Sequence, residues 1–589
     1  MNIVQGEFRT AARRAAHPVG WKGKAWRDLR DDEIEKNLSD KAVLEKLGDA
    51  GRPSRWADAI PGRVEDVLMA GGDGRLDLDP ESGLNSYGCK LQPRNDEVSF
   101  SSSTASTISE QAFAAAGRAH RLLQQASVHV GSGVAVNHAI ERLRRNLKEE
   151  LGFADTDIGV VLSPSGTDSA IHALAIARCL MAGPPVSIIA ASEETGSGIA
   201  SAAAGRHPDR RTALGASVTK GQVIEGLGEG MDCIPLPCRD AQGRLLDAAR
   251  GDLLLRTVIG RVVDTKRPVL LYAMDQSKLG SRMPGEGCLD TLASIHSGQP
   301  MVVVDACQGR VSRARIKWYL DKGFMVQITG SKFFGGPAFC GALLVPPHLS
   351  ARMREVQKLP AGLKDYTSRC DWPADWESVR QALPETPNLG SWLRWVAALE
   401  EMRAYYAVPV FFRDQALGRF SWVVSELIRR DPDLELMTDP TGGLVAQRTP
   451  GSAPDEMEHR SILPFFIKEK GRPLSMSEAV KLHQALNRDL SRRLPPTASE
   501  AERTLAATPC HIGQPVAVPV PGFGLCGALR ISADARLVSE AWRKGGEVQG
   551  TAHLELQFAR AGLVLRKIRL ARRLLDETPA KPQPLAATA

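Results

Sequence analysis

The sequence predicts an α/β fold in which a mostly parallel sheet is covered by helices. Apolar stretches of strand length begin near residues 158, 186, 269, 301, 325 and 340, and they alternate with segments that we expect to be helical. Continuous apolar strands of this kind are typical of parallel sheets that are buried on both faces. Polar residues directly follow several of the stretches, at the end of the strand where ligands bind in open α/β sheets.

The chain of 589 residues is too long for one hydrophobic core, so we expect more than one structural unit. Residues 1–75 form a charged, Trp-containing extension whose role the sequence does not indicate. We expect a large cofactor domain over 120–398 and a smaller domain over 399–575, which the segment 76–119 joins. The proline-rich tail, 576–589, is expected to be disordered.

The composition, with 43% hydrophobic and 24% charged residues, is ordinary for a globular protein. The sequence shows neither an apolar run of membrane-spanning length nor the apolar core of a signal peptide, so we expect a cytoplasmic protein with no membrane partner. The ten cysteines are dispersed without a Cys-x-x-Cys pair, so no metal is expected. A net charge of +7, spread along the chain, gives no reason to expect nucleic acid.

A lysine and an aspartate follow two of the predicted strands. Asp305 ends the apolar run Met301 to Val304, and Lys332 follows the strand near 325. A lysine that loses its proton in a desolvated site can hold an aldehyde as a Schiff base, and a buried carboxylate keeps a pyridine nitrogen protonated. Pyridoxal phosphate (PLP) needs both groups, with Lys332 as the catalytic amine. Gln308 would donate a hydrogen bond to the phenolic oxygen of this cofactor.

A third stretch has the features of an anion site. The strand near 158 is followed by the turn Pro164 to Asp168 and by a predicted helix over 169–181. The N-terminus of a helix presents free backbone N–H groups to an anion, and the helix dipole adds to the attraction. We therefore expect the cofactor phosphate at Ser165, Gly166 and Thr167. Thr329, at the end of the strand before Lys332, is a further expected cofactor contact.

Each of these motifs, taken alone, is more often structural. A strand-ending aspartate usually caps a loop, a Gly-Thr-Asp turn usually begins a helix, and a Ser-Lys pair usually lies in a solvated loop. In this order, and each placed after an apolar strand, the three motifs together indicate a cofactor site.

The ordered motifs resemble those of fold type I PLP-dependent enzymes, in particular the class V aminotransferase and cysteine desulfurase-like branch. The resemblance covers about residues 80–540 and rests on the segments Ser165-Gly166-Thr167, Asp305-Ala306-Cys307-Gln308, Gly330-Ser331-Lys332, Thr386-Pro387-Asn388 and Arg530-Ile531-Ser532. It implies a large domain with a mostly parallel, seven-stranded-type sheet and a smaller α+β C-terminal domain.

The resemblance also implies a homodimer with shared active sites. In such a dimer Thr386 would contact the phosphate of the neighbouring subunit's cofactor. Arg530 would bind the α-carboxylate of the substrate, a task that suits a planar guanidinium.

One departure from the branch concerns its reactive cysteine. Cysteine desulfurases carry it in a His-Cys-Ala-Gln-Pro-like loop, whereas the corresponding run here is His511-Ile512-Gly513-Gln514-Pro515. Ile512 cannot accept sulfur, and we interpret Cys510 as structural. Desulfurase activity is therefore disfavoured.

A second departure lies where the family places a ring that stacks on the cofactor. Glu194 occupies that position after the strand near 186. Either this carboxylate, in contact with the substrate, takes part in proton transfer, or it is a loop residue and another side chain stacks, with His207 and Tyr87 as candidates.

The early segment around Asn85 and Tyr87, together with the serine-rich run that contains Ser103, has two interpretations. By resemblance these residues line the substrate entrance; alternatively, they form a turn that caps a helix beginning at Glu110.

A Gly-x-Gly-x-x-Gly run from Gly522 to Gly527 matches a dinucleotide fingerprint, but a strand follows it in place of the required helix, so we interpret it as a turn before Arg530.

The sequence therefore predicts a PLP-dependent enzyme that forms an external aldimine with an amino acid or amine. Transamination is the default reaction because it requires only Lys332 as proton carrier. A lyase or a β/γ-replacement enzyme is the alternative, favoured by the desulfurase-like late loop and by Glu194. A PLP-domain regulator that senses a ligand is a remote alternative, because it would need a DNA-binding module that residues 1–75 do not clearly show.

Overall fold

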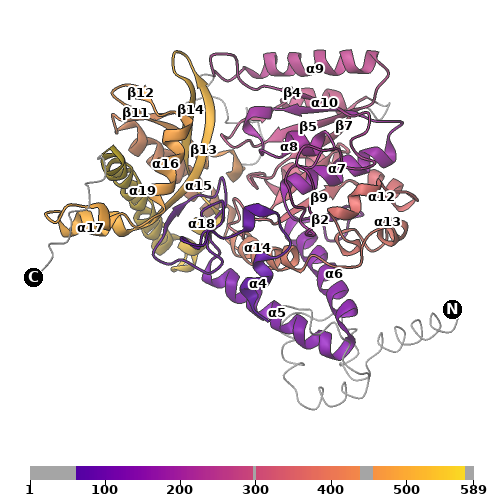
Figure 1. Cartoon of the computed structure of the whole chain (residues 1–589), viewed down its shortest axis with the longest axis horizontal. Helices are drawn as coiled ribbons and strands as arrows, with labels where there is room; N and C mark the ends of the chain where they lie inside the picture. Colours follow the sequence, from indigo (N-terminus) through magenta and orange to yellow (C-terminus); the bar gives the residue numbers. More distant parts are fainter. Residues whose placement is uncertain (1–61, 296–299, 438–454, 577–589) are drawn as a thin grey trace, which may run out of the picture.

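The computed structural model describes residues 62–295, 300–437 and 455–576. Most of the N-terminal extension, and the tail apart from Asp576, lie outside these residues, as do the predictions made for them. The described chain forms two β-sheets with helices packed around them (Figure 1). The predicted α/β fold is confirmed.

The larger sheet contains all six predicted strands. Its order is β2 (Gly159–Ser163), β9 (Gly341–Val345), β8 (Met325–Thr329), β7 (Met301–Asp305), β5 (Val269–Asp275), β3 (Val186–Ala190) and β4 (Asp232–Leu236), and the short β6 (Arg282–Met283) pairs with β5. β9 runs antiparallel to β2 and β8, whereas the other strands on this path are parallel to one another. The carboxyl ends of β2, β8, β7, β5 and β3 consequently lie at one edge of the sheet.

Both faces of this sheet are buried. In β2, Val160 and Leu162 belong to one hydrophobic core, whereas Val161 belongs to a second core on the opposite face. The helices that accompany the sheet in the chain are α7 (Gly166–Leu180), α8 (Ile199–Ala203), α9 (Ala248–Asp264), α10 (Glu286–Ala293), α11 (Arg313–Asp321), α12 (Pro347–Arg354) and α13 (Glu377–Gln381). Burial on both faces explains why these strands are continuously apolar.

The smaller sheet combines an early segment with the C-terminal part of the chain. Its order is β1 (Val98–Phe100), β13 (Cys510–Val520), β14 (Gly524–Ser532), β11 (Ile462–Glu469) and β10 (Leu434–Leu436), and β12 (Arg472–Pro473) pairs with β11. β1 runs parallel to β13, and the remaining pairs are antiparallel. The turn before β14 confirms that the Gly522 run is not a dinucleotide motif.

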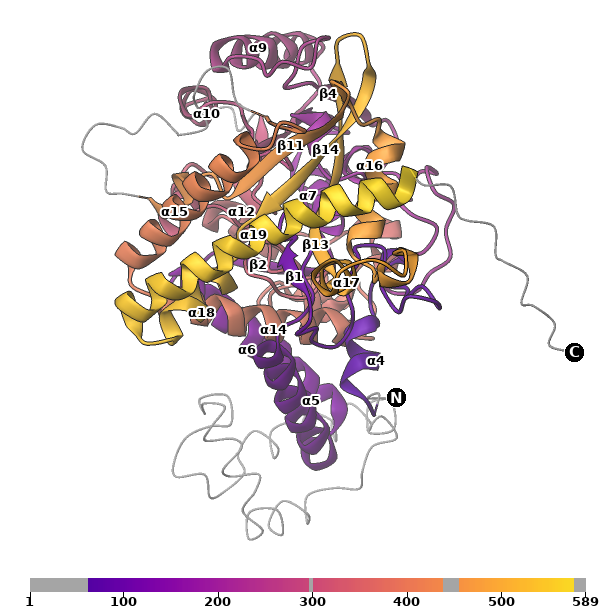
Figure 2. The same cartoon turned by 90° about the vertical axis from the view of Figure 1, so that its left-hand side faces the viewer.

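Helices of the C-terminal part pack beside this sheet, and Figure 2 shows the long α19 running past α15 and α16. These helices are α15 (Val410–Arg429), α16 (Met476–Leu486), α17 (Glu500–Ala507), α18 (Ala535–Arg543) and α19 (Gly546–Asp576). The short α4 (Val64–Met69) and the helices α5 (Glu110–Val130), α6 (Ser132–Leu151) and α14 (Leu389–Tyr406) pack together below the sheets in Figure 1. Among the described residues, no helix is long and apolar enough to cross a membrane.

Candidate cofactor site

The three predicted motifs meet at the carboxyl edge of the larger sheet. Thr329 at the end of β8 and Ser163 at the end of β2 both pair with Gly341 of β9. A Cβ atom added to Gly166 would lie 2.7 Å from the Sγ of Cys307 and 3.9 Å from the Cγ2 of Thr329. The turn after β2 therefore packs directly on the strand ends that carry the other two motifs, and only a residue without a side chain fits there.

The turn after β2 forms the N-terminus of α7. Ser165 is the N-cap residue: its Oγ accepts a hydrogen bond from the backbone N–H of Asp168 at 3.2 Å and donates one to Asp168 Oδ2 at 2.5 Å. Burial raises the pKa of Asp168 to about 6, and nearby Asp73 adds to the effect. α7 begins at Gly166, earlier than the predicted Ser169, so the first-turn amides of Gly166 and Thr167 have no partner within the helix and can bind an anion.

Lys332 follows β8 and is half-buried. Burial is the largest influence and lowers the pKa of its amine; Arg530 and Arg310 act in the same direction, while Cys307 and Asp305 oppose them. A lysine whose pKa is lowered by burial and by neighbouring cations is suited to react as a neutral amine.

Asp305 is buried at the end of β7. Its Oδ1 accepts a hydrogen bond from the backbone N–H of Cys307 at 3.1 Å, and its Oδ2 accepts one from Thr195 Oγ1 at 3.2 Å. Two donors of this kind hold a carboxylate in one orientation. The buried aspartate, the desolvated lysine and the tightly packed glycine turn fit the ring nitrogen, the aldehyde and the phosphate of PLP, respectively.

Gln308 and Thr329 hold neighbouring loops in this structure. Gln308 donates to the carbonyl of Ser103 at 3.2 Å and accepts from Arg310 at 3.1 Å. Thr329 Oγ1 donates to the carbonyl of Cys307 at 2.6 Å. Both side chains lie at the edge that carries Lys332, and their contacts with a cofactor remain predictions.

Arg530, in β14 of the smaller sheet, is buried against the same edge. Its guanidinium makes five hydrogen bonds: to the carbonyls of Ser103 (3.2 Å) and Lys278 (3.2 Å), to Thr104 Oγ1 (2.8 Å), and twice to the carbonyl of Gln514 (2.6 and 3.1 Å). Burial lowers the pKa of Arg530 to about 9, while Glu194 opposes this effect. A substrate carboxylate at Arg530 would have to replace some of these bonds, because the guanidinium has five N–H groups in all.

Glu194 is buried in a short 3-10 helix, Ser192–Glu194, and both of its carboxylate oxygens are engaged. Oε1 pairs with Nε and Nη2 of Arg239, each at 2.6 Å, and Oε2 accepts a hydrogen bond from Ser277 Oγ. These contacts favour the interpretation of Glu194 as a loop residue that holds its surroundings over a role in proton transfer.

The two candidates for a stacking ring lie in different surroundings. His207 stacks on Tyr366 with ring centres 5.8 Å apart, and its Nδ1 lies 2.6 Å from the Tyr366 hydroxyl. The ring of Tyr87 lies 6.4 Å from that of Phe339. Burial raises the pKa of Tyr87, while Arg75 opposes the rise.

The early segment lies against β13, close to Arg530. Asn85 Oδ1 accepts hydrogen bonds from the backbone N–H groups of Tyr87 and Cys89, which closes a turn. The carbonyl of Tyr87 lies 2.9 Å from His511 Nε2. The N-cap of α5 is Ser109, which follows the serine-rich run, so the run continues into a helix cap as well as lying beside Arg530.

Cys510 and Thr386 differ in their exposure to solvent. Cys510 is buried at the start of β13, and burial raises the pKa of its thiol to about 11, as expected for an unreactive cysteine. Thr386 is exposed ahead of α14.

Lys278 belongs to this site but was not predicted. It follows β5, and burial together with Arg530 and Lys332 lowers the pKa of its amine to about 8. The signal that could have identified it is the one that identified Asp305: a polar residue soon after a buried apolar strand.

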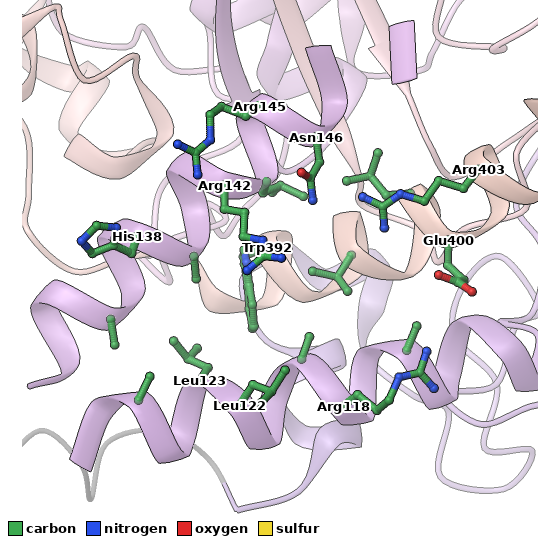
Figure 3. Close-up of a pocket in the computed structure, with 18 residues that line it drawn as sticks. Arg118, Leu122, Leu123, His138, Arg142, Arg145, Asn146, Trp392, Glu400 and Arg403 are labelled. Atoms are coloured by element: carbon green, nitrogen blue, oxygen red, sulfur yellow. The ribbon is translucent and has the colours of Figure 1, made fainter. Parts of the chain in front are cut away.

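A separate cavity of about 200 Å³ lies between α5, α6 and α14. Figure 3 shows Trp392 at its centre, Leu122 and Leu123 on one side, and Arg142 and Asn146 on the other. The described residues that line it include none of the predicted site residues, so this cavity is distinct from the cofactor site.

No family model and no curated protein matches the chain. Among solved structures, the cystine C-S lyase C-DES, in complex with its reaction product cysteine persulfide, is 12% identical with a TM-score of 0.47, over 80% of this chain and 98% of that chain. The cysteine desulfurase CsdA from Escherichia coli is 16% identical with a TM-score of 0.41, over 79% and 95% of the two chains. TDC from Oryza sativa, solved with PLP, is 12% identical with a TM-score of 0.45, over 92% and 99%.

Proposed function

We propose that this chain is a PLP-dependent enzyme that acts on an amino acid or amine. The observation that carries the proposal is the approach of Gly166 to Cys307 and Thr329, which places a helix N-terminus next to the strand ends that bear Asp305 and Lys332. A phosphate site, a buried carboxylate and a desolvated lysine side by side match three polar groups of this cofactor: its phosphate, its ring nitrogen and its aldehyde.

Each residue has a defined task in this proposal. When bound, PLP supplies an aldehyde that reacts with amines and a ring that withdraws electrons. Lys332 provides the amine that holds the cofactor and then carries a proton to and from the substrate carbon. Asp305 keeps the ring nitrogen protonated, and the amides of Gly166 and Thr167, capped by Ser165, bind the phosphate.

The remaining predicted residues surround this centre. Gln308 and Thr329 contact the cofactor, and Arg530 receives the α-carboxylate of the substrate. Asn85 and Tyr87 line the entrance. Thr386 reaches the phosphate bound by the partner subunit of a homodimer.

The direct test is the visible absorption of the purified protein after addition of PLP, compared with the Lys332→Ala variant. The wild type should turn yellow, and borohydride reduction followed by peptide mass analysis should place the cofactor on Lys332. Lys220→Ala, at an exposed lysine, serves as the matched control and should behave as the wild type. A wild-type protein that gains neither the absorption band nor the reduced adduct would contradict the proposal.

Transamination is the reaction we propose first, because Lys332 alone suffices as its proton carrier. A stoichiometric reaction with an amino acid should then convert the bound cofactor to pyridoxamine phosphate and release a 2-oxo acid. Release of a leaving group or of carbon dioxide, with the cofactor recovered unchanged, would identify a lyase instead.

A further inference from the structure

The backbone of Lys278 is fixed between two residues of the proposed site. Its N–H donates to the carbonyl of Glu194 at 3.0 Å, and its carbonyl accepts a hydrogen bond from Arg530 at 3.2 Å. The side chain is half-buried. Within the parts of the chain that the structure describes, its ammonium makes no hydrogen bond, and no carboxylate lies within 4.0 Å of it.

The charged groups that face Lys278 are those of the cofactor site. Apart from burial, the influences that lower the pKa of its amine come from Arg530 and Lys332, whereas Asp305 and Glu194 raise it. With a pKa of about 8, the amine is mostly charged at neutral pH.

Neither carboxylate in these surroundings is free to neutralise Lys278. Asp305 is held by Cys307 and Thr195, and in the proposed function its charge serves the ring nitrogen. Glu194 is paired with Arg239 and is bound by Ser277. The α-carboxylate of an amino acid would offset the charge of Arg530 alone, so the charge of Lys278 remains uncompensated.

We propose that Lys278 binds a second anionic group on the substrate, so that the site selects amino acids with an acidic side chain. This inference rests on the proposed PLP function and adds the substrate class to it. A half-buried ammonium that is fixed at its backbone and has no carboxylate partner gains most from a ligand oxyanion. The expected ligands carry a carboxylate or a phosphate ester beyond the α-carbon.

The test compares equilibrium binding of matched amino acids to the cofactor-loaded protein, followed by the change in cofactor absorption and by calorimetry. The pairs are L-aspartate with L-asparagine, L-glutamate with L-glutamine, and O-phospho-L-serine with L-serine. At least one acidic member should bind about tenfold or more tightly than its neutral partner, because a hydrogen bond to a charged group is involved. Which pair shows the difference distinguishes a carboxylate from a phosphate ligand.

Two variants assign this preference to Lys278. Lys278→Met should remove the preference for the acid and leave binding of the neutral partner nearly unchanged. Lys278→Arg keeps the charge and should keep the preference. Lys220→Met, at an exposed lysine, is the matched control and should behave as the wild type.

The outcomes separate this inference from the proposed function. A protein that binds no PLP contradicts both. A cofactor-loaded wild type that binds the acidic and neutral members of every pair equally contradicts the inference alone. A Lys278→Met variant that turns over more slowly with an unchanged preference would also overturn it, because Lys278 would then be a proton carrier.

Discussion

The charge of Lys278 gives the proposed substrate preference a defined pH dependence. Its amine has a pKa of about 8 in the folded protein, lowered mainly by burial, so it loses its proton as the pH rises through 8. Only the protonated amine attracts an anion. The ratio of affinities for the acidic and neutral members of a pair should therefore be nearly constant below pH 7 and should fall above pH 8, by up to about tenfold per pH unit, until the preference is lost. Binding measured from pH 6.5 to 9.5 tests this.

Lys278→Arg provides the control for this pH dependence. A guanidinium has a higher ordinary pKa than an ammonium in the same surroundings, so the preference of that variant should decline at a higher pH than that of the wild type. A wild-type ratio that declines over the same pH range as that of Lys278→Arg would show that the titration of Lys278 does not govern the preference.

Gly166→Ala should weaken PLP binding. The new methyl group would lie 2.7 Å from Cys307 Sγ, which is closer than real contacts allow, so either the turn or Cys307 must move. Overpacking of this kind costs about 1–3 kcal/mol, and part of that cost should appear as a decrease of about tenfold in cofactor affinity. Equilibrium dialysis against PLP measures it.

The double variant Gly166→Ala with Cys307→Ala shows whether the clash is the cause. Removal of Sγ leaves the Cβ of residue 307 at 3.6 Å, an ordinary contact distance, so the double variant should regain most of the lost affinity. An affinity that stays as low as that of the single variant would indicate that the turn fails for another reason.

At the scale of residues, the sequence predicted which side chains stand at strand ends but not what they contact. Asp305 and Lys332 could be predicted because each follows an apolar run whose burial is evident from composition. The pairing of Glu194 with Arg239 joins residues 45 positions apart, and Arg530 binds Ser103 across 427 positions. Contacts of this kind depend on which strands become neighbours and on how the two sheets meet, and local periodicity encodes neither.

At the scale of elements, α7 is joined to β2 by a buried histidine. His172 Nδ1 lies 2.8 Å from Ser163 Oγ, and the histidine ring lies 5.5 Å from that of Trp372. Burial lowers the pKa of His172 to about 3, so the folded protein keeps the ring neutral. The unfolded chain gains a proton below its ordinary pKa of about 6.5, whereas the folded protein does not, so the stability from this residue is lost as the pH falls from 6.5 toward 3.

His172→Asn should remove this part of the acid sensitivity. An amide can still reach the Ser163 hydroxyl, but it does not titrate. The variant should be less stable than the wild type at pH 7.5, because it fills less of the core. Below pH 6.5 the difference in unfolding free energy between the two proteins should shrink by up to about 1.4 kcal/mol per pH unit, and the difference in melting temperature should shrink with it. A difference in melting temperature between the two proteins that stays constant from pH 7.5 to 5 would contradict the neutral state assigned to His172.

The predicted and missed elements differ in their position in the sheet. Of the six predicted strands, only β2 lies at an edge of the larger sheet, where it pairs with β9. All six are continuously buried. β4 was missed because it is an edge strand, partly exposed, with a proline at position 235. At the start of α19, Gly546 and Gly550 weaken the helical signal in the sequence.

At the scale of the whole molecule, the candidate site lies where the two sheets are bonded to each other. Arg310, which follows β7 of the larger sheet, donates to Ser461 Oγ at 2.9 Å and to the carbonyl of Ala533 at 3.0 Å, both next to strands of the smaller sheet. Arg530 makes the reverse connection, from β14 to Lys278. A substrate that displaces some of the bonds of Arg530 would therefore act on the contact between the sheets, which links binding to their relative position.

The proposed homodimer predicts that two defective variants can repair each other. Lys332→Ala removes the amine, and Thr386→Asp places a carboxylate at an exposed position that we expect to face the phosphate of the partner subunit's cofactor. In a mixed dimer, one site would combine the intact Lys332 of one chain with the intact Thr386 of the other. Random exchange of subunits makes half of the dimers mixed, so about a quarter of all sites should bind PLP normally. Cofactor absorption per chain, before and after exchange, measures this recovery. If Thr386 served its own subunit, or if the chain were monomeric, exchange would restore nothing, because the Thr386→Asp chain would keep its defect beside its own Lys332.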